Sequence, residues 1–234
     1  MQLKPLNMNK NILEIINVNK SYKHKNGEVK IFSNISLSIK KGELIALVGP
    51  SGSGKSSLLN MISFLDLPDS GEIIFQDKKL SGLSESDKNY FRINKISLIF
   101  QNNNLLNDFT AEENVALPLI IKNEKKDKAI KQAQKILKDF NLSNRNSHFP
   151  DELSGGEQQR VAIARCLIAG TDLILADEPT GNLDYNTSQE VFSYFLKLKK
   201  LNKTIIFATH NRELANKADY KLSISNCDIK RTDV

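Results

Sequence analysis

The chain has 234 residues, of which 40% are hydrophobic, and a formal net charge of +6. This length can bury a large core without disulfide bonds, and the two cysteines, Cys166 and Cys227, lie far apart without metal-ligand spacing. We therefore expect two reduced thiols in a cytosolic protein. The positive charge is spread along the chain without an aromatic-rich basic face, which argues against nucleic-acid binding.

The sequence also argues against a membrane-spanning or a secreted protein. The apolar runs are all shorter than a bilayer requires, and the N-terminal stretch MQLKPLNMNKN lacks the hydrophobic segment of an export signal. We expect a chain that stays in the cytoplasm and acts at a membrane only through a partner.

The N-terminal part of the chain is rich in strand-forming residues. Runs of β-branched and aromatic side chains, separated by Gly, Asn, Asp and Lys, predict strands at Leu13 to Val18, Ile35 to Ile39, Leu44 to Val48 and Glu72 to Phe75.

A glycine-rich loop follows the third of these strands. From Gly49 to Ser56 the sequence reads GPSGSGKS, which fits G-x-x-x-x-G-K-[ST], and Ser57 to Leu65 has helical composition. Glycines let the backbone N–H groups point at a phosphate, and the new helix adds its positive dipole end. We expect Lys55 to bridge the β- and γ-phosphates and Ser56 to bind Mg²⁺. The predicted nucleotide contacts here are Gly49, Pro50, Ser51, Gly52, Ser53, Gly54, Lys55, Ser56 and Ser57.

The middle of the chain turns helical. Gln101 follows the run Ser97 to Phe100, and its neutral amide is suited to bind Mg²⁺ or the attacking water. From Ala111 to about Phe140 the apolar residues recur at helical spacing, broken by Pro118 and by the polar residues around Asn123. We predict a helical lobe at about residues 110–151.

The last third alternates between helices and strands. The pattern predicts, in order, a helix from Glu157 to Ile168, a strand from Leu173 to Ala176, a helix from Thr187 to Leu201, a strand from Thr204 to Ala208 and a short helix from Asn211. Such alternation is typical of a parallel sheet with helical crossovers. With neither a linker nor a repeat in the sequence, residues 1–234 are expected to form one folded unit with two lobes.

Polar residues follow the two buried strands of this part. Asp177 and Glu178 emerge at the carboxyl end of one strand, where parallel sheets bind ligands. We expect Asp177 to orient Mg²⁺, and Glu178 to act as general base on a water in line with the γ-phosphate. A solvated turn is the plain alternative for such a pair, but the phosphate loop upstream favours catalysis. His210 follows the other strand and is expected to touch the γ-phosphate.

The string LSGGEQ, from Leu153 to Gln158, completes a family resemblance. With the phosphate loop and the acidic pair, the chain resembles the ATP-binding subunit of an ABC transporter. The resemblance implies an α/β fold with a P-loop NTPase core of mostly parallel sheet, an antiparallel β subdomain and an α-helical subdomain. It also implies ATP and Mg²⁺ as cofactors, Tyr22 stacked on adenine, and a loop containing Asn182, Leu183 and Asp184 that signals across a dimer.

The LSGGEQ segment is a second anion site. Ser154, Gly155 and Gly156 offer a hydroxyl and backbone N–H groups at a helix N-terminus, and Glu157 belongs to the same set. One chain cannot bring both anion sites to one ATP. The resemblance implies that a second copy pairs head to tail with the first, so that ATP lies between the phosphate loop of one and the LSGGEQ of the other.

Two segments resemble a particular branch of the family. Phe109 to Ile121 and the GNLD of Gly181 to Asp184 are similar to the branch that serves lipoprotein-releasing transporters of the bacterial inner membrane. Macrolide-export and cell-division complexes stay as alternatives, because Asn102 to Asn104 stand where lipoprotein-releasing members often carry bulkier or His residues. The branch implies integral membrane permease partners and a peripheral position on the cytoplasmic face of the inner membrane.

The segment after Gln101 is the expected contact with that partner. We predict a short helix rich in Leu105, Leu106 and Phe109, which either receives the coupling helix of the permease or packs in the core.

Other function classes fit the sequence less well. A DNA-repair ABC ATPase needs a long coiled coil between the motifs, and the ribosomal type needs two cassettes in one chain; the sequence has neither. A nucleotide switch without hydrolysis gains nothing from a base such as Glu178 beside the γ-phosphate.

Overall fold

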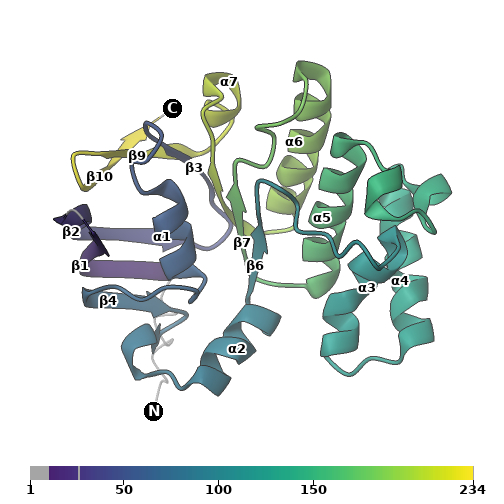
Figure 1. Ribbon diagram of the computed structural model, residues 1–234, viewed down its shortest axis with the longest axis horizontal. Coiled ribbons are helices and arrows are strands. Elements are labelled where there is room, and N and C mark those ends of the chain that lie inside the picture. The colour runs from purple at the N-terminus through teal and green to yellow at the C-terminus, as the bar shows by residue number, and fades with distance from the viewer. Residues whose placement is uncertain (1–10, 26, 234) are drawn as a thin grey trace, which may run out of the picture.

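The computed structural model describes residues 11–25 and 27–233, and its strands form two sheets (Figure 1). The first sheet is antiparallel, with the order β2-β1-β4-β5. Its strands are β1 (Asn11–His24), β2 (Gly27–Lys40), β4 (Ser70–Phe75) and β5 (Lys78–Lys79).

The second sheet carries the phosphate loop. Its order is β10-β9-β3-β8-β7-β6, and all neighbours are parallel except the antiparallel pair β9 and β10. The strands are β3 (Leu44–Val48), β6 (Ile96–Ile99), β7 (Leu173–Asp177), β8 (Thr204–Ala208), β9 (Tyr220–Ser225) and β10 (Asp228–Asp233). Because β3, β8 and β7 are adjacent and parallel, the residues after each strand meet at one edge.

The described part of the chain also contains seven α-helices and three short 3-10 turns. The helices are α1 (Lys55–Ile62), α2 (Glu85–Asn94), α3 (Ala111–Ile121), α4 (Lys126–Asp139), α5 (Gly155–Ala169), α6 (Tyr185–Lys200) and α7 (Arg212–Ala215). The 3-10 turns are η1 (Leu80–Gly82), η2 (Ser143–Arg145) and η3 (Pro150–Glu152). Figure 1 shows α5 and α6 beside the second sheet, with α3 and α4 on the far side of α5.

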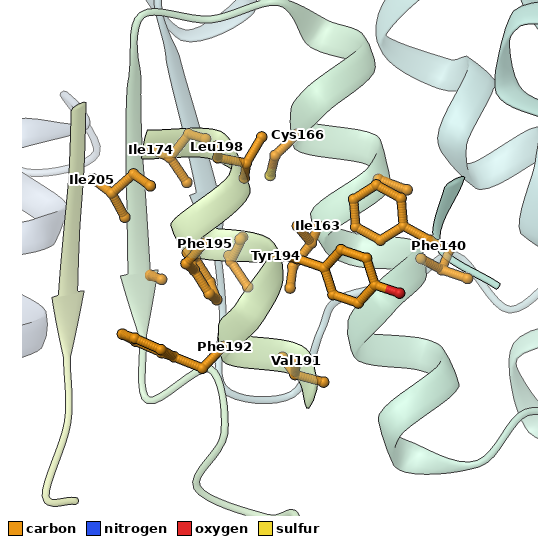
Figure 2. Close-up of a cluster of buried hydrophobic side chains, with 14 of the residues drawn as sticks. Phe140, Ile163, Cys166, Ile174, Val191, Phe192, Tyr194, Phe195, Leu198 and Ile205 are labelled. Carbon is orange, nitrogen blue, oxygen red and sulfur yellow. The ribbon is translucent and has the colours of Figure 1, made fainter. Parts of the chain in front are cut away.

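Side-chain alternation along β3 divides the core into two clusters. Leu44 and Ala46 pack with α5 and α6, whereas Ile45 and Leu47 face α1 and the antiparallel sheet. In the first cluster, Phe192 and Phe195 of α6 lie against the sheet (Figure 2). On the far side of α6, the Tyr194 ring stacks on Phe140 with centroids 4.3 Å apart, so the core continues towards the helical region.

The predicted break at Pro118 is wrong. Pro118 lies inside α3, which continues to Ile121. Contacts of α3 with both α4 and α5 outweigh the roughly 3 kcal/mol intrinsic cost of an internal proline. The chain turns instead around Asn123, whose φ of 64° is left-handed, as the polar residues there predicted.

The predicted short helix after Gln101 is also wrong. Residues 102–110 form an irregular loop with turns at its two ends, and Asn103 and Asn104 have left-handed φ values of 58° and 44°. The buried side chain of Asn114 holds this loop, because its oxygen accepts from Leu106 N at 2.9 Å and its amide donates to Leu106 O at 3.0 Å. The backbone bonds that a helix would use are thereby taken by a side chain.

Other boundaries differ from the predictions. The antiparallel strands β1 and β2 extend well beyond their predicted cores, and α2, β9 and β10 were not predicted. Helix α1 begins at Lys55 rather than Ser57, because the left-handed Gly54 ends the loop, and it stops at Ile62, just before the left-handed Phe64.

The N-terminal stretch 1–10, predicted to lack an export signal, lies outside the described residues. Among the residues described, the helices are too short or too polar to cross a bilayer.

Candidate active site

The phosphate loop joins β3 to α1 and requires glycine at two places. Gly52 and Gly54 have left-handed φ values of 77° and 105°. A Cβ at Gly54 would stand 2.6 Å from Ile31 Cγ2 and 3.0 Å from Phe32 Cζ, so the close packing of β2 also excludes a side chain there. A Cβ at Gly52 would meet nothing within 4 Å, which shows that this part of the loop faces open space.

Lys55 is the buried cation of the loop. Its side chain is turned inward, and Nζ donates to Gly49 O at 3.0 Å and to Pro50 O at 3.1 Å. Ser53 Oγ is buried and has no hydrogen-bond partner within the described part of the chain. A buried cation, an unpaired hydroxyl and the N-terminus of α1 form the donor set that a phosphate group requires, so these residues fit a nucleotide.

A cavity of about 300 Å³ opens on this loop. It is lined by Ile31, Ser51, Gly52, Gly54, Lys55, Ser56, Ser57, Glu178 and His210. The fold therefore brings together the phosphate loop and two predicted catalytic residues from the ends of two other strands.

Glu178 and His210 contact each other at the wall of this cavity. His210 Nε2 lies 2.7 Å from Glu178 Oε1. Glu178 directly follows β7 and has a left-handed φ of 46°, held by bonds from Glu178 N to Ala208 O at 3.1 Å and from Gly181 N to Glu178 O at 3.0 Å. A non-glycine residue in this conformation is strained, and such strain persists where the surroundings fix a functional side chain.

Of the three predicted metal ligands, only Ser56 lines this cavity. Asp177 is the last residue of β7, directly before Glu178; it is partly buried and is not among the residues that line the cavity. Gln101 lies two residues after the end of β6 and is exposed; it lines a neighbouring cavity of about 260 Å³, which Glu178 also lines. Glu178 thus stands between the phosphate loop and Gln101.

Tyr22 on β1 is held by two residues that the sequence analysis missed. Its hydroxyl donates to Asp66 Oδ2 at 2.6 Å, and Lys20 Nζ donates to Asp66 Oδ1 at 2.8 Å while lying 4.8 Å from the Tyr22 ring centroid. Burial raises the pKa of Tyr22, and the bond to Asp66 raises it further. The ring remains 39% exposed, and the predicted adenine stacking stays a prediction. No local pattern links residues this far apart in the chain.

Ser154 is the N-cap of α5 and forms a capping box with Glu157. Its Oγ accepts from Glu157 N at 3.3 Å, and Glu157 Oε2 accepts from Ser154 N at 2.8 Å. Arg145 Nε donates to Glu157 Oε1 at 2.8 Å; burial acts to raise the pKa of Glu157, but the bonds from Arg145 and Ser154 lower it overall. A Cβ at Gly156 would lie 2.4 Å from Thr187 Cγ2, so glycine lets α5 approach α6 closely.

The LSGGEQ segment faces a cavity of its own, of about 390 Å³. It is lined by Ser154, Gly155, Gly156, Glu157, Arg160, Asn182, Leu183, Asp184 and Thr187. None of these residues lines the phosphate-loop cavity. Asp184 caps α6 by accepting from Thr187 N at 3.1 Å, which fixes the loop beside this second site.

The parallel sheet, the phosphate loop and the glutamate at its edge define a P-loop nucleotide hydrolase. A family model described as ABC transporter matches residues 32–181. The chain therefore belongs to the ABC transporter family and is an ATP-binding, ATP-hydrolysing subunit of that family.

Two curated relatives match almost the whole chain. The lipoprotein-releasing system ATP-binding protein LolD of Rickettsia bellii is 45% identical over 218 residues, covering 92% of this chain and 96% of the relative. The protein of the same name from Bordetella pertussis is 40% identical over 215 residues, covering 92% of this chain and 93% of the relative.

A solved structure gives the same fold. The dimeric post-hydrolysis structure of the ATP-binding cassette MJ0796, bound to ADP and Pi, has a TM-score of 0.88 and 36% sequence identity, covering 94% of this chain and 98% of that one. The predicted fold class, with its mostly parallel sheet, antiparallel β region and helical region, is confirmed.

Proposed function

We propose that Glu178 is the general base of ATP hydrolysis in the phosphate-loop cavity. The observation that carries this proposal is the 2.7 Å contact between Glu178 Oε1 and His210 Nε2 at the wall shared with Lys55. Glu178 takes a proton from a water in line with the γ-phosphate, the water oxygen bonds to phosphorus, and the bond to the bridging oxygen of ADP breaks. Lys55 holds the β- and γ-phosphates, and His210 orients the carboxylate through Nε2 and contacts the γ-phosphate.

The other residues around the cavity would bind and orient the nucleotide. Ser56, Asp177 and Gln101 would hold Mg²⁺, which when bound neutralises phosphate charge. Oxygen and amide side chains are the donors that this ion prefers. The half-exposed ring of Tyr22 would stack on adenine, with Lys20 on one of its faces.

The variant Glu178→Gln tests the role of the carboxylate. The amide keeps the shape of the side chain but cannot accept the proton, so ATP should still bind while turnover falls at least about 100-fold. The variant should also accumulate as an ATP-bound dimer in size-exclusion chromatography. Undiminished turnover, or a monomer alone in the presence of ATP, would contradict the assigned role.

We further propose that a second copy of the chain completes each ATP site. Support comes from the separation of the two anion sites: the LSGGEQ cavity and the phosphate-loop cavity share no lining residue in the described structure. The MJ0796 cassette, at 36% identity, forms a dimer. Ser154→Arg should therefore leave ATP binding to the monomer intact and abolish ATP-dependent dimerisation. Loss of ATP binding by the monomer would count against this geometry.

We propose lipoprotein release from the inner membrane as the process that this ATPase energises. Support comes from the LolD proteins, which are 40–47% identical and are named as ATP-binding proteins of lipoprotein-releasing systems. The chain would then sit at the cytoplasmic face of the inner membrane, bound to integral membrane permease subunits.

The test is a tagged pull-down from native membranes with Mg-ATP, followed by identification of the co-purifying membrane proteins. Permease subunits of a lipoprotein-releasing system would support the proposal. Subunits of a macrolide-export or cell-division complex would replace it with one of those functions. Recovery of ribosomes or DNA would contradict the proposed role in transport and leave the proposed ATPase chemistry unaffected.

A further inference from the structure

The loop after Gln101 is fastened to helix α5 by one arginine. Arg165 Nη1 donates to Asn104 O at 3.0 Å, and Arg165 Nη2 donates to Asn103 O at 2.9 Å. The guanidinium is desolvated, and its burial lowers the pKa of Arg165 from the ordinary value. Within the described residues Arg165 forms no ion pair, so its guanidinium depends on these two carbonyls for its hydrogen bonds. The contact is therefore a charge-assisted clamp on the loop.

This clamp acts on the turn that contains Gln101. Asn103 N donates to Phe100 O at 3.0 Å and closes a turn around Gln101, and Asn104 N donates to Asn102 O at 2.6 Å. Asn103 and Asn104 are both left-handed, a conformation that brings their consecutive carbonyls to the two arms of one guanidinium. Displacing Arg165 would therefore release the backbone that sets the position of the Gln101 side chain.

The same helix carries the second anion site at its other end. Ser154 is the N-cap of α5, and Arg165 lies eleven residues further along, a span of about 16 Å at 1.5 Å per residue. Its middle is packed against α3 and α6, with Val161, Ala162 and Ile163 fully buried, so close packing connects the two ends of the helix. A displacement of the helix at Ser154 would therefore also shift the guanidinium that binds the carbonyls of Asn103 and Asn104.

We infer that Arg165 is a positioning residue for Gln101, and that through it the LSGGEQ end of α5 sets the geometry of the ATP site of the same chain. Contact of Ser154 with the ATP of the other copy then places Gln101 for the hydrolysis of this chain's own ATP. The inference rests on the proposed role of Gln101 and on the proposed head-to-tail dimer.

The experiment is a double-mutant cycle of Arg165→Lys and Gln101→Ala, read as kcat and KM for ATP with Mg²⁺. Lysine keeps the charge but loses the two-armed geometry, so kcat should fall about 10-fold, the equivalent of one charged hydrogen bond, with KM within about twofold. In the Gln101→Ala background the Arg165→Lys change should have almost no further effect. The control is Arg92→Lys, whose guanidinium also donates to a backbone carbonyl, Phe64 O at 2.7 Å, but on α2; its kcat should match the wild type.

Each other outcome overturns a distinct claim. If the fold loss in kcat of the double variant equals the product of the two single losses, Arg165 acts independently of Gln101. That result overturns the inference but leaves the proposed role of Gln101 in place. Undiminished kcat in Gln101→Ala overturns the proposed role of Gln101 and the inference with it. Melting temperatures of both variants are measured as well. If Arg165→Lys and Arg92→Lys lower the melting temperature and kcat to the same extent, loss of folded protein explains the lower kcat. The role of Arg165 is then structural and the inference is wrong.

Discussion

The variant Gly156→Ala tests the close approach of α5 to α6. The added Cβ would lie 2.4 Å from Thr187 Cγ2, about 1 Å inside an ordinary carbon–carbon contact, so one of the two helices must shift. Overpacking of this kind costs about 1 to 3 kcal/mol, offset by up to about 1 kcal/mol from the better helix propensity of alanine. We expect the free energy of unfolding to fall by about 1 to 2 kcal/mol, measured by urea denaturation followed by circular dichroism.

A second substitution should reverse the loss. Thr187→Ser removes Cγ2 but keeps the hydroxyl that donates to Asp184 Oδ2 at 2.5 Å. The next atom that the new Cβ meets is Thr187 Cβ at 3.8 Å, an ordinary contact. The double variant should therefore be at least as stable as Thr187→Ser alone. If Gly156→Ala is as stable as the wild type, or if Thr187→Ser gives no rescue, the proposed steric reason for glycine is wrong.

Three further predictions concern burial and charge. Burial raises the pKa of Cys166 to about 11, so iodoacetamide at pH 8 should label the partly exposed Cys227 in the native protein and reach Cys166 only in urea, as read by mass spectrometry. Glu157→Gln should keep the capping box and lose the ion pair with Arg145, costing about 0.5 to 1 kcal/mol at pH 7. Because the folded pKa of Glu157 is lowered, this difference from the wild type should vanish as the pH falls through that pKa, and a constant difference in acid would contradict it. Phe195→Ala should cost about 3 to 5 kcal/mol in urea denaturation, and a loss below about 1 kcal/mol would refute its placement in the core.

The parallel strands and the phosphate loop could be predicted from sequence because their signal is local. Buried parallel strands read as continuous apolar runs, and the predicted Leu173 to Ala176 and Thr204 to Ala208 agree with β7 and β8 to within one residue. Edge strand β10 gives no such signal, since its residues are polar or charged and exposed except for the buried Ile229. It forms by pairing with β9, which is a tertiary effect.

The details of the site depend on contacts between distant residues. The left-handed backbone of Glu178 is held by a bond to Ala208 on the neighbouring strand, and the loop after Gln101 is shaped by Asn114. The clamp on Tyr22 by Asp66 likewise joins residues 44 positions apart. Residue types and motif spacing identified the chemistry, whereas these distant contacts decide where the side chains stand.

The most direct test of the composite ATP site is ATP turnover in a mixture of two inactive variants, Lys55→Ala and Ser154→Arg. A mixed dimer joins the intact phosphate loop of the Ser154→Arg chain to the intact LSGGEQ of the Lys55→Ala chain, and so restores one site. We expect the mixture to hydrolyse ATP well above either variant alone, and this activity should follow the fraction of mixed dimer. Turnover in the mixture no greater than the sum of the separate variants would contradict a site shared between two copies.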